Sequence, residues 1–195
     1  MKKPRKHLRF NKILFILIIF LVGQTSGQEY TLSNAASELT VFGTSNLHDW
    51  DVNAETQSGK LVLDASDQLQ IKHLKVVVTA ESLKSGRGGM DKNTYKALNT
   101  SKPKSIILEM NNVSTNSDLG NGSYRVSSVG DLTIAGVTKK TEIEFIMELS
   151  SNTVNLKGKK ILKMTDYGVT PPKALLGTIT TGDEISINFN TILKK

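Results

Sequence analysis

The chain has 195 residues, of which 38% are hydrophobic and 22% charged, and it contains no Cys. This length fits one domain with a hydrophobic core, and the lack of Cys excludes disulfides and the Cys-anchored lipoprotein class. A formal charge of +7 is typical of nucleic-acid-binding proteins unless the charge is confined to one segment.

The first 27 residues predict a cleaved secretory signal peptide. Six Lys and Arg lie before residue 13, residues 13–22 are all apolar, and Thr25, Ser26 and Gly27 provide small side chains for cleavage. The apolar run is shorter than the about 20 residues of a spanning helix, although an uncleaved anchor stays open as the alternative. Without this segment 19 basic and 18 acidic residues remain. The net charge therefore belongs to the targeting segment and does not indicate nucleic-acid binding.

From residue 37 onward, apolar residues at every second position predict strands with one buried face. Turn-like residues at 43–46 and 57–59 separate the first of them. These predicted strands are residues 38–42, 50–55, 61–63, 69–71 and 73–80. We expect the last of them to turn Leu74, Val76 and Val78 inward.

Residues 85–99 interrupt the alternation. Residues 85–89 are polar and Gly-rich, and Arg87 among flexible backbone amides is suited to contact an anionic head group. One helical face is then shared by Met90, Thr94, Tyr95 and Leu98. We expect a helix that starts at Asp91 and ends at Asn99. It either closes one end of the fold as a plug or lid, or packs outside as an irregular connection.

A hairpin from Tyr124 to Leu149 carries the clearest pattern of the chain. Its first strand places Tyr124, Val126, Leu132 and Ile134 on one face, and its second strand does the same with Ile143, Phe145, Met147 and Leu149. Further strands are expected around residues 156–164 and 185–189, on either side of a long loop at 166–182. So many half-buried strands predict an all-β protein, either a sandwich or a closed antiparallel barrel.

A barrel of about eight strands is just wide enough to hold a small or elongated apolar ligand. Burial of an apolar chain is non-directional, so such a lumen selects ligands by length and shape. The expected lining includes Val126, Leu132, Ile134, Phe145, Met147 and Phe189. Alternation alone does not separate a cavity from a filled core, and a filled barrel instead fits a stress-related structural or interaction module.

The cluster of His48, Asp49 and Asp51 is the one group with reactive side chains. It allows a metal-dependent enzyme as a further alternative, but neighbours in an extended segment point to opposite faces, and no nucleophile motif accompanies them. We therefore favour a non-catalytic protein in which Trp50 packs while His48 and Asp49 fix a turn. The Lys pairs at 139–140 and 159–160 are interpreted as charges at turns or strand ends that face water.

Five segments together resemble the YceI-like family. They are residues 42–50, residues 78–85 with Met90 and Asp91, residues 130–139, residues 165–168 and residues 182–187. The resemblance implies a lipocalin-like antiparallel barrel with one short inserted helix, exported to the bacterial periplasm, whose lumen takes a polyisoprenoid or other long lipid. Met90 and Thr165 stand at two positions where many members of the family have Arg.

Residues 28–195 are therefore predicted to form one YceI-like barrel domain after the signal peptide at 1–27. Its predicted ligand is a lipid, either an isoprenoid or a fatty-acid-like molecule, and we expect no further cofactor, metal or nucleic acid. The sequence leaves open whether the protein forms a homodimer. The predicted ligand contacts are Phe42, Trp50, Arg87, Met90, Tyr95, Leu98, Val126, Leu132, Ile134, Phe145, Met147, Met164 and Phe189.

Overall fold

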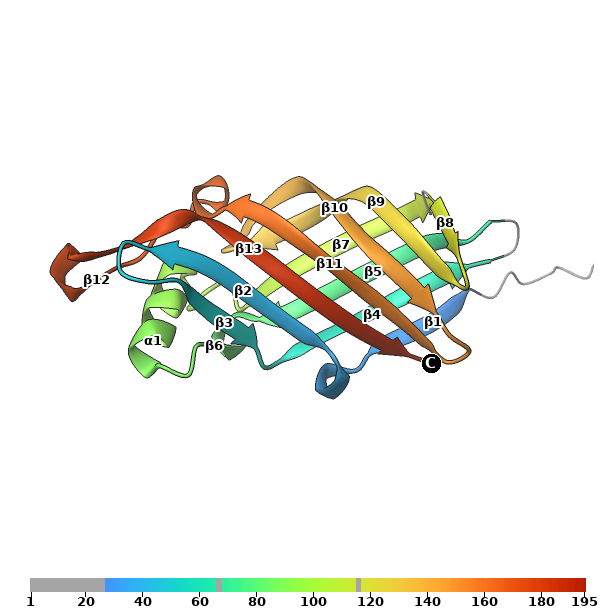
Figure 1. The fold of residues 1–195 in the computed structure, drawn as a ribbon, viewed down its shortest axis with the longest axis horizontal. Coiled ribbons are helices and arrows are strands. Elements are labelled where there is room, and N and C mark those ends of the chain that lie inside the picture. The colour runs from blue at the N-terminus through green and yellow to red at the C-terminus, as the bar shows by residue number, and fades with distance from the viewer. Residues whose placement is uncertain (1–26, 66–67, 115–116) are drawn as a thin grey trace, which may run out of the picture.

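The structure is a computed structural model that describes residues 27–65, 68–114 and 117–195. These residues form mostly strands, which close into an antiparallel barrel of eight strands with a single α-helix at one end (Figure 1). The predicted all-β barrel with one inserted helix is thereby confirmed. The predicted signal peptide lies, except for Gly27, outside the described residues. No helix within those described ranges has the length and apolar character needed to cross a membrane.

The helix α1 spans Gly88–Ala97. The strands in chain order are β1 (Gln28–Leu32), β2 (Glu38–Ser45), β3 (Trp50–Ala54), β4 (Gln57–Asp64), β5 (Gln70–Thr79), β6 (Leu83–Lys84), β7 (Ser105–Ser114), β8 (Ser117–Gly120), β9 (Ser123–Ile134), β10 (Val137–Leu149), β11 (Thr153–Lys163), β12 (Lys173–Ala174) and β13 (Ile179–Lys194). Two short 3-10 helices, η3 (Met164–Tyr167) and η4 (Leu175–Gly177), connect the last three strands.

The barrel closes through β13, which has 16 residues. The ring runs in the order β1, β4, β5, β7, β9, β10, β11 and β13, and the last residues of β13 pair with β1. The earlier residues of β13 pair instead with β2, which continues into β3 and β6. The strand β2 thus takes the place of the short β1 beside β13 at the end where α1 lies (Figure 1).

Alternation along the strands sorts side chains between the interior and water, as predicted. In β10 the side chains of Ile143, Phe145 and Met147 are buried, whereas those of Glu144 and Glu148 at alternate positions are exposed. This period of two is the property of an extended chain that has one face against a core.

Two apolar clusters lie at different positions along the barrel interior. The first, which we call the core cluster, consists of the buried residues Tyr30, Leu32, Leu61, Leu63, Ile71, Leu74, Met110, Val113, Val126, Ile143, Phe145, Met147, Val154, Leu156 and Leu193. The second, which we call the mouth cluster, lies toward α1 and contains Val52, Val78, Ala80, Leu83, Leu98, Leu132, Ile134, Leu162, Met164, Tyr167 and Val169.

The predicted turn at residues 43–46 is wrong, because β2 continues to Ser45. Gly43 is paired with Trp50 of β3, and a Cβ atom built on Gly43 would lie 2.1 Å from the indole ring. Gly43 is therefore a strand residue whose missing side chain admits a large neighbour, which is a recognised use of Gly inside strands.

Other predicted boundaries also differ from the structure. The predicted break at residues 57–59 is wrong, because β4 starts at Gln57. The helix starts at Gly88 and not at Asp91, because the Asp91 carboxylate accepts hydrogen bonds from Ser85 rather than capping the helix. The predicted loop at 166–182 is shorter, since β12 and the start of β13 form a hairpin within it. Pro172 lacks a backbone N–H, but its carbonyl still accepts a hydrogen bond from the Thr181 N–H.

Candidate functional site

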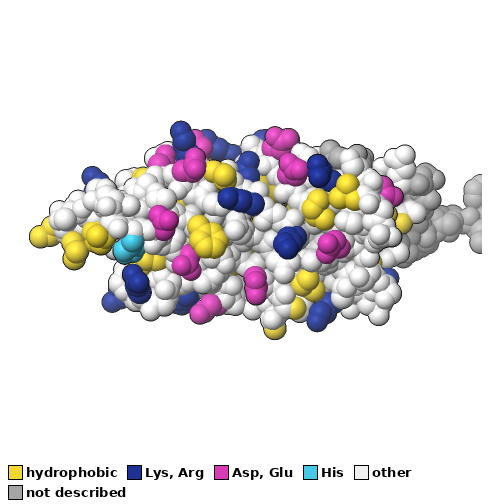
Figure 2. All heavy atoms as spheres, in the orientation of Figure 1, with side chains coloured by type: hydrophobic (Ala, Val, Ile, Leu, Met, Phe, Trp, Pro, Cys, Tyr) yellow, Lys and Arg dark blue, Asp and Glu magenta, His cyan; other side chains and the backbone are white. Residues whose placement is uncertain are grey.

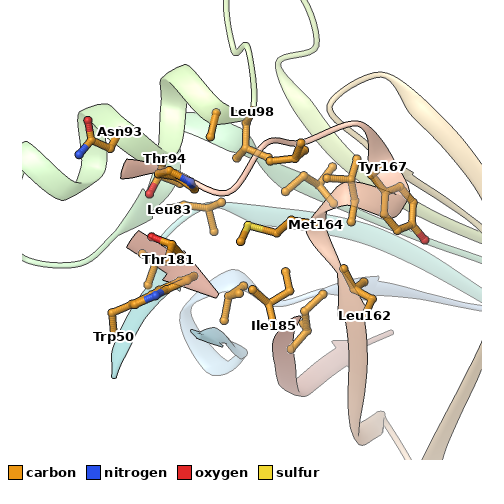
Figure 3. Close-up of a pocket in the computed structure, with 18 of the residues that line it drawn as sticks. Trp50, Leu83, Asn93, Thr94, Leu98, Leu162, Met164, Tyr167, Thr181 and Ile185 are labelled. Carbon is orange, nitrogen blue, oxygen red and sulfur yellow. The ribbon is translucent and has the colours of Figure 1, made fainter. Parts of the chain in front are cut away.

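The barrel interior holds a cavity of about 770 Å³. The core cluster forms its floor, and α1 and η3 lie at its open end (Figure 3). The η4 segment also borders this open end. Most of the wall is aliphatic or aromatic and comes from inward residues of β2, β3, β5, β7, β9, β10, β11 and β13. A concave, mostly apolar space of this size is typical of sites for one small or elongated molecule. The interior is thus filled at the core cluster and open at the mouth cluster.

Met164 lies in the middle of the open end (Figure 3). Its side chain extends from η3 between Leu83 of β6 and Ile185 of β13, while Leu98 at the end of α1 approaches from the helix side. An unbranched thioether adapts to irregular neighbours, so Met164 is suited to a wall that meets a flexible apolar chain.

The rim of the cavity includes the exposed leucines of η4. Leu175 is 72% exposed and Leu176 109% exposed, and both have left-handed backbone conformations with φ of 47° and 55°. Figure 2 shows hydrophobic side chains gathered at the end of the molecule where β12 lies. The open end therefore presents apolar surface to water as well as to the cavity.

The charged side chains of the cavity wall are all basic. They are Arg87, Lys160 and Lys173, and no Asp or Glu of the described chain contributes to the wall. Arg87 and Lys173 are exposed at the rim, whereas Lys160 is partly buried on the inward face of β11. The interpretation of Lys160 as a strand-end charge in water is wrong, because β11 continues to Lys163.

Most of the predicted ligand contacts come together on the cavity wall. These are Trp50, Arg87, Met90, Leu98, Leu132, Ile134, Phe145, Met164 and Phe189. They belong to elements far apart in the sequence, and the barrel brings them around one space. Their contact with a ligand stays a prediction.

The other four predicted residues lie elsewhere. Phe42 is 43% exposed on the outer face of β2, since Leu39 and Val41 take the inward positions of that strand. Val126 and Met147 are fully buried in the core cluster, beyond the floor of the cavity. Tyr95 points away from the cavity, because its hydroxyl accepts a hydrogen bond from Lys84 Nζ at 2.6 Å and donates one to the Leu83 carbonyl at 3.1 Å.

Sequence reasoning missed several wall residues. Leu39 and Val41 were recognisable from their alternation, which places them inward. Lys160 shares the parity of Leu156 and Leu162, so the same rule applied strictly would have found it. The η4 leucines had no comparable signal, because only the tertiary fold brings residues 175–177 to the rim.

Asp91 anchors α1 to the segment before it. Its Oδ1 accepts hydrogen bonds from the Ser85 hydroxyl at 2.6 Å and from the Ser85 backbone N–H at 2.8 Å. These two bonds favour the ionised form and lower the pKa of Asp91 below its ordinary value, against the opposing effect of burial. Asp91 is buried, and its two hydrogen bonds tie the first turn of α1 to Ser85.

Two further polar contacts hold the open end. The hydrogen bond to the Tyr95 hydroxyl raises the pKa of Lys84 and ties β6 to α1. Asp183 of β13 accepts hydrogen bonds from the Thr165 hydroxyl at 2.6 Å and the Thr165 N–H at 2.9 Å, and these bonds lower the pKa of Asp183. The η3 segment that carries Met164 is thereby fastened to the barrel.

The His48 cluster forms a turn at the rim. Ser45 Oγ donates to the His48 carbonyl at 2.7 Å and accepts from the His48 N–H, while the His48 ring is 2.7 Å from the Asp49 carbonyl. Trp50 packs on Gly43, and its indole N–H donates to the Thr44 carbonyl at 2.9 Å. Within the described residues, no three His, Cys, Asp or Glu side chains are grouped so that they could hold a metal ion.

A family model for the YceI-like domain matches residues 30–193, which is nearly the whole described chain. This chain belongs to the YceI-like family. The resemblance to this family that the sequence motifs indicate is thus confirmed over residues 30–193. No curated protein matches this YceI-like chain at a significant level.

Solved structures support the same fold for this YceI-like protein. A polyisoprenoid-binding domain from Saccharophagus degradans has a TM-score of 0.67 at 14% identity, with 85% of this chain and 97% of that domain covered. BcnA from Burkholderia cenocepacia has a TM-score of 0.66 at 14% identity, covering 83% and 98% of the two chains. A YceI protein from Campylobacter jejuni has a TM-score of 0.53 at 18% identity, with 74% and 84% covered.

Proposed function

We propose that this YceI-like protein is an exported, periplasmic and non-catalytic carrier that binds a long apolar lipid or polyisoprenoid chain inside its barrel. The observation that carries the proposal is the cavity of about 770 Å³, lined mostly by apolar side chains and open beside α1. The similar domain from Saccharophagus degradans is described as polyisoprenoid-binding, which supports a ligand of the same kind.

The energetic basis is the removal of an apolar chain from water. Each buried methylene contributes about 0.8 kcal/mol, so a long chain gains affinity with length and needs few directed contacts. The wall offers no convergent set of nucleophile, base and orienting group among the described residues, which fits binding better than catalysis.

Native mass spectrometry of the full chain, expressed with its own N-terminal segment in a bacterial host, tests the proposal. We expect an additional mass that is released with organic solvent and identified as a lipid. The blocking variant Ile187→Trp places a large ring on the inward face of β13 and should abolish that mass. The matched variant Asn188→Trp alters the exposed neighbour on the outer face and should retain it. Ligand-free wild-type protein that also fails to take up long-chain isoprenoids would contradict the proposal.

Export is tested separately by the intact mass of the protein recovered from the periplasm. Cleavage after the predicted leader should give a chain that begins close to Gln28. Recovery of the uncleaved chain from the membrane fraction would contradict export as a periplasmic carrier.

A further inference from the structure

Lys160 lies on the inward face of β11, where the flanking inward side chains are apolar. The residues Lys159, Ile161 and Lys163 face outward and are exposed, whereas Leu156 and Leu162 on the parity of Lys160 are buried. Across the ladder, Lys160 is paired with Ile187 of β13, which also lines the cavity. The Lys160 side chain therefore begins on the apolar wall of the cavity, between Leu156 of the core cluster and Leu162 of the mouth cluster.

The ammonium group of Lys160 has no partner in the described chain. Each of the five ion pairs within the described ranges joins other residues, and the Lys160 side chain makes no hydrogen bond or other polar contact there. The four other Lys side chains in those ion pairs, Lys60, Lys72, Lys75 and Lys140, meet carboxylates on the outside of the sheet. Lys160 differs from them because no carboxylate lines its surroundings.

An unpaired ammonium in an apolar wall is unfavourable unless something compensates its lost hydration. Water at the open end compensates part of it while the cavity is unliganded. A ligand whose chain displaces that water removes this compensation, unless the ligand itself brings an anionic group. Lys160 therefore favours a ligand that combines an apolar chain with a negative charge over a neutral chain of the same length.

We propose that Lys160 binds the anionic group, a carboxylate or a phosphate, of an amphiphile whose apolar chain occupies the cavity. This inference rests on the proposed function and specifies the chemical class of its ligand. Lys173 and Arg87 at the rim carry the same sign, but Arg87 shares a small neighbouring pocket with Asp49 and Asp51, so we assign the preference for an anion to Lys160.

The test compares three probes of equal chain length, palmitate, hexadecyl phosphate and 1-hexadecanol, with free inorganic phosphate as the fourth. Trp50 is the sole Trp of the chain and lies on the cavity wall, so its fluorescence reports occupancy. For the wild type we expect both anionic probes to bind about tenfold to a hundredfold more tightly than the alcohol, as one charge-assisted hydrogen bond allows. Inorganic phosphate at millimolar concentration should leave the fluorescence unchanged.

The variant Lys160→Met keeps the length of the side chain and removes its charge. It should bind the anionic probes no more tightly than the alcohol, while Lys160→Arg should restore the preference. Lys159→Met removes a charge from the adjacent outward position and should leave all affinities unchanged. Thermal unfolding by circular dichroism verifies that each variant is folded.

The outcomes separate this inference from the proposed function. Equal preference for anions in the wild type and Lys160→Met would overturn the inference and leave lipid binding intact. Binding of none of the three chain-bearing probes to the wild type would overturn the proposed function itself. Saturable binding of inorganic phosphate without a chain would also overturn the inference, because the site would then recognise a free anion.

Discussion

Substitution of Gly43 by Ala tests whether the rim of the cavity depends on one close contact. The added Cβ would lie 2.1 Å from the nearest atom of the Trp50 indole ring and 2.5 Å and 2.7 Å from two others. Real carbon atoms do not approach so closely, so the indole ring must move. The movement breaks the hydrogen bond of 2.9 Å from the indole N–H to the Thr44 carbonyl.

The expected cost follows from these contacts. Overpacking costs about 1–3 kcal/mol, and the lower chain entropy of unfolded Ala relative to Gly offsets about 0.4–1 kcal/mol of it. We expect a net loss of about 1–2 kcal/mol in the free energy of unfolding, which lowers the Tm by roughly 2–8 °C for a domain of this size. Denaturant unfolding gives the first quantity and a thermal scan the second.

Because Trp50 is the sole Trp, its emission reports the displacement directly. The spectrum of Gly43→Ala should shift, whereas Gly89→Ala should leave it unchanged, since nothing lies within 4 Å of a Cβ on Gly89. In a Trp50→Leu background, the cost of Gly43→Ala should shrink below about 0.5 kcal/mol, because the clashing ring is gone. An unchanged Trp50 spectrum together with unchanged stability in Gly43→Ala would refute the reasoning.

Other parts of the barrel allow equally direct tests. Met147→Ala removes a fully buried side chain from the core cluster and should lower the free energy of unfolding by about 2–5 kcal/mol, while the lipid affinity of the folded protein stays constant; a changed affinity would contradict the separation of core and cavity. Asp91→Ala removes the acceptor of the two Ser85 hydrogen bonds and should cost about 1–3 kcal/mol at pH 7. Because the folded pKa of Asp91 is lowered, its stabilisation is present above the ordinary Asp pKa of about 4 and is lost as the pH falls through the folded value, so the wild type should approach Asp91→Ala at low pH. A difference that stays constant down to pH 2, measured by urea unfolding at each pH, would contradict this assignment.

The barrel was predictable from the sequence because period-two alternation is a local property of strands that have one wet face. Residues 124–149 show this most clearly, since their alternation agrees with the structure along both strands. The helix was predictable in kind but not in its start. Asp is a residue type that often caps helices, yet the Asp91 carboxylate accepts hydrogen bonds from Ser85 instead. This partner depends on how the loop before the helix folds back, which the local sequence does not specify.

The cavity was harder to predict, because the same alternation describes a packed and an open interior. Val126 and Phe145 are both inward and apolar, yet Val126 lies within the packed region and Phe145 reaches the wall. The two residues are paired directly across β9 and β10, so neither their parity nor their level in the barrel separates them, and only the packing around each side chain in the folded barrel shows which one reaches the cavity. The charge of Lys160 suggests a surface position, whereas its parity with Leu156 and Leu162 indicates the interior, and the structure shows that the parity was the better guide.

The separation of the core cluster from the mouth cluster divides the molecule into a stabilising half and an adaptable half. Substitutions around the entrance then alter which guest is accepted while the packed half continues to hold the fold together. The barrel is therefore a suitable scaffold for engineered hydrophobic cargo, in which the lining of the open half is redesigned and the rest of the chain is left as it is.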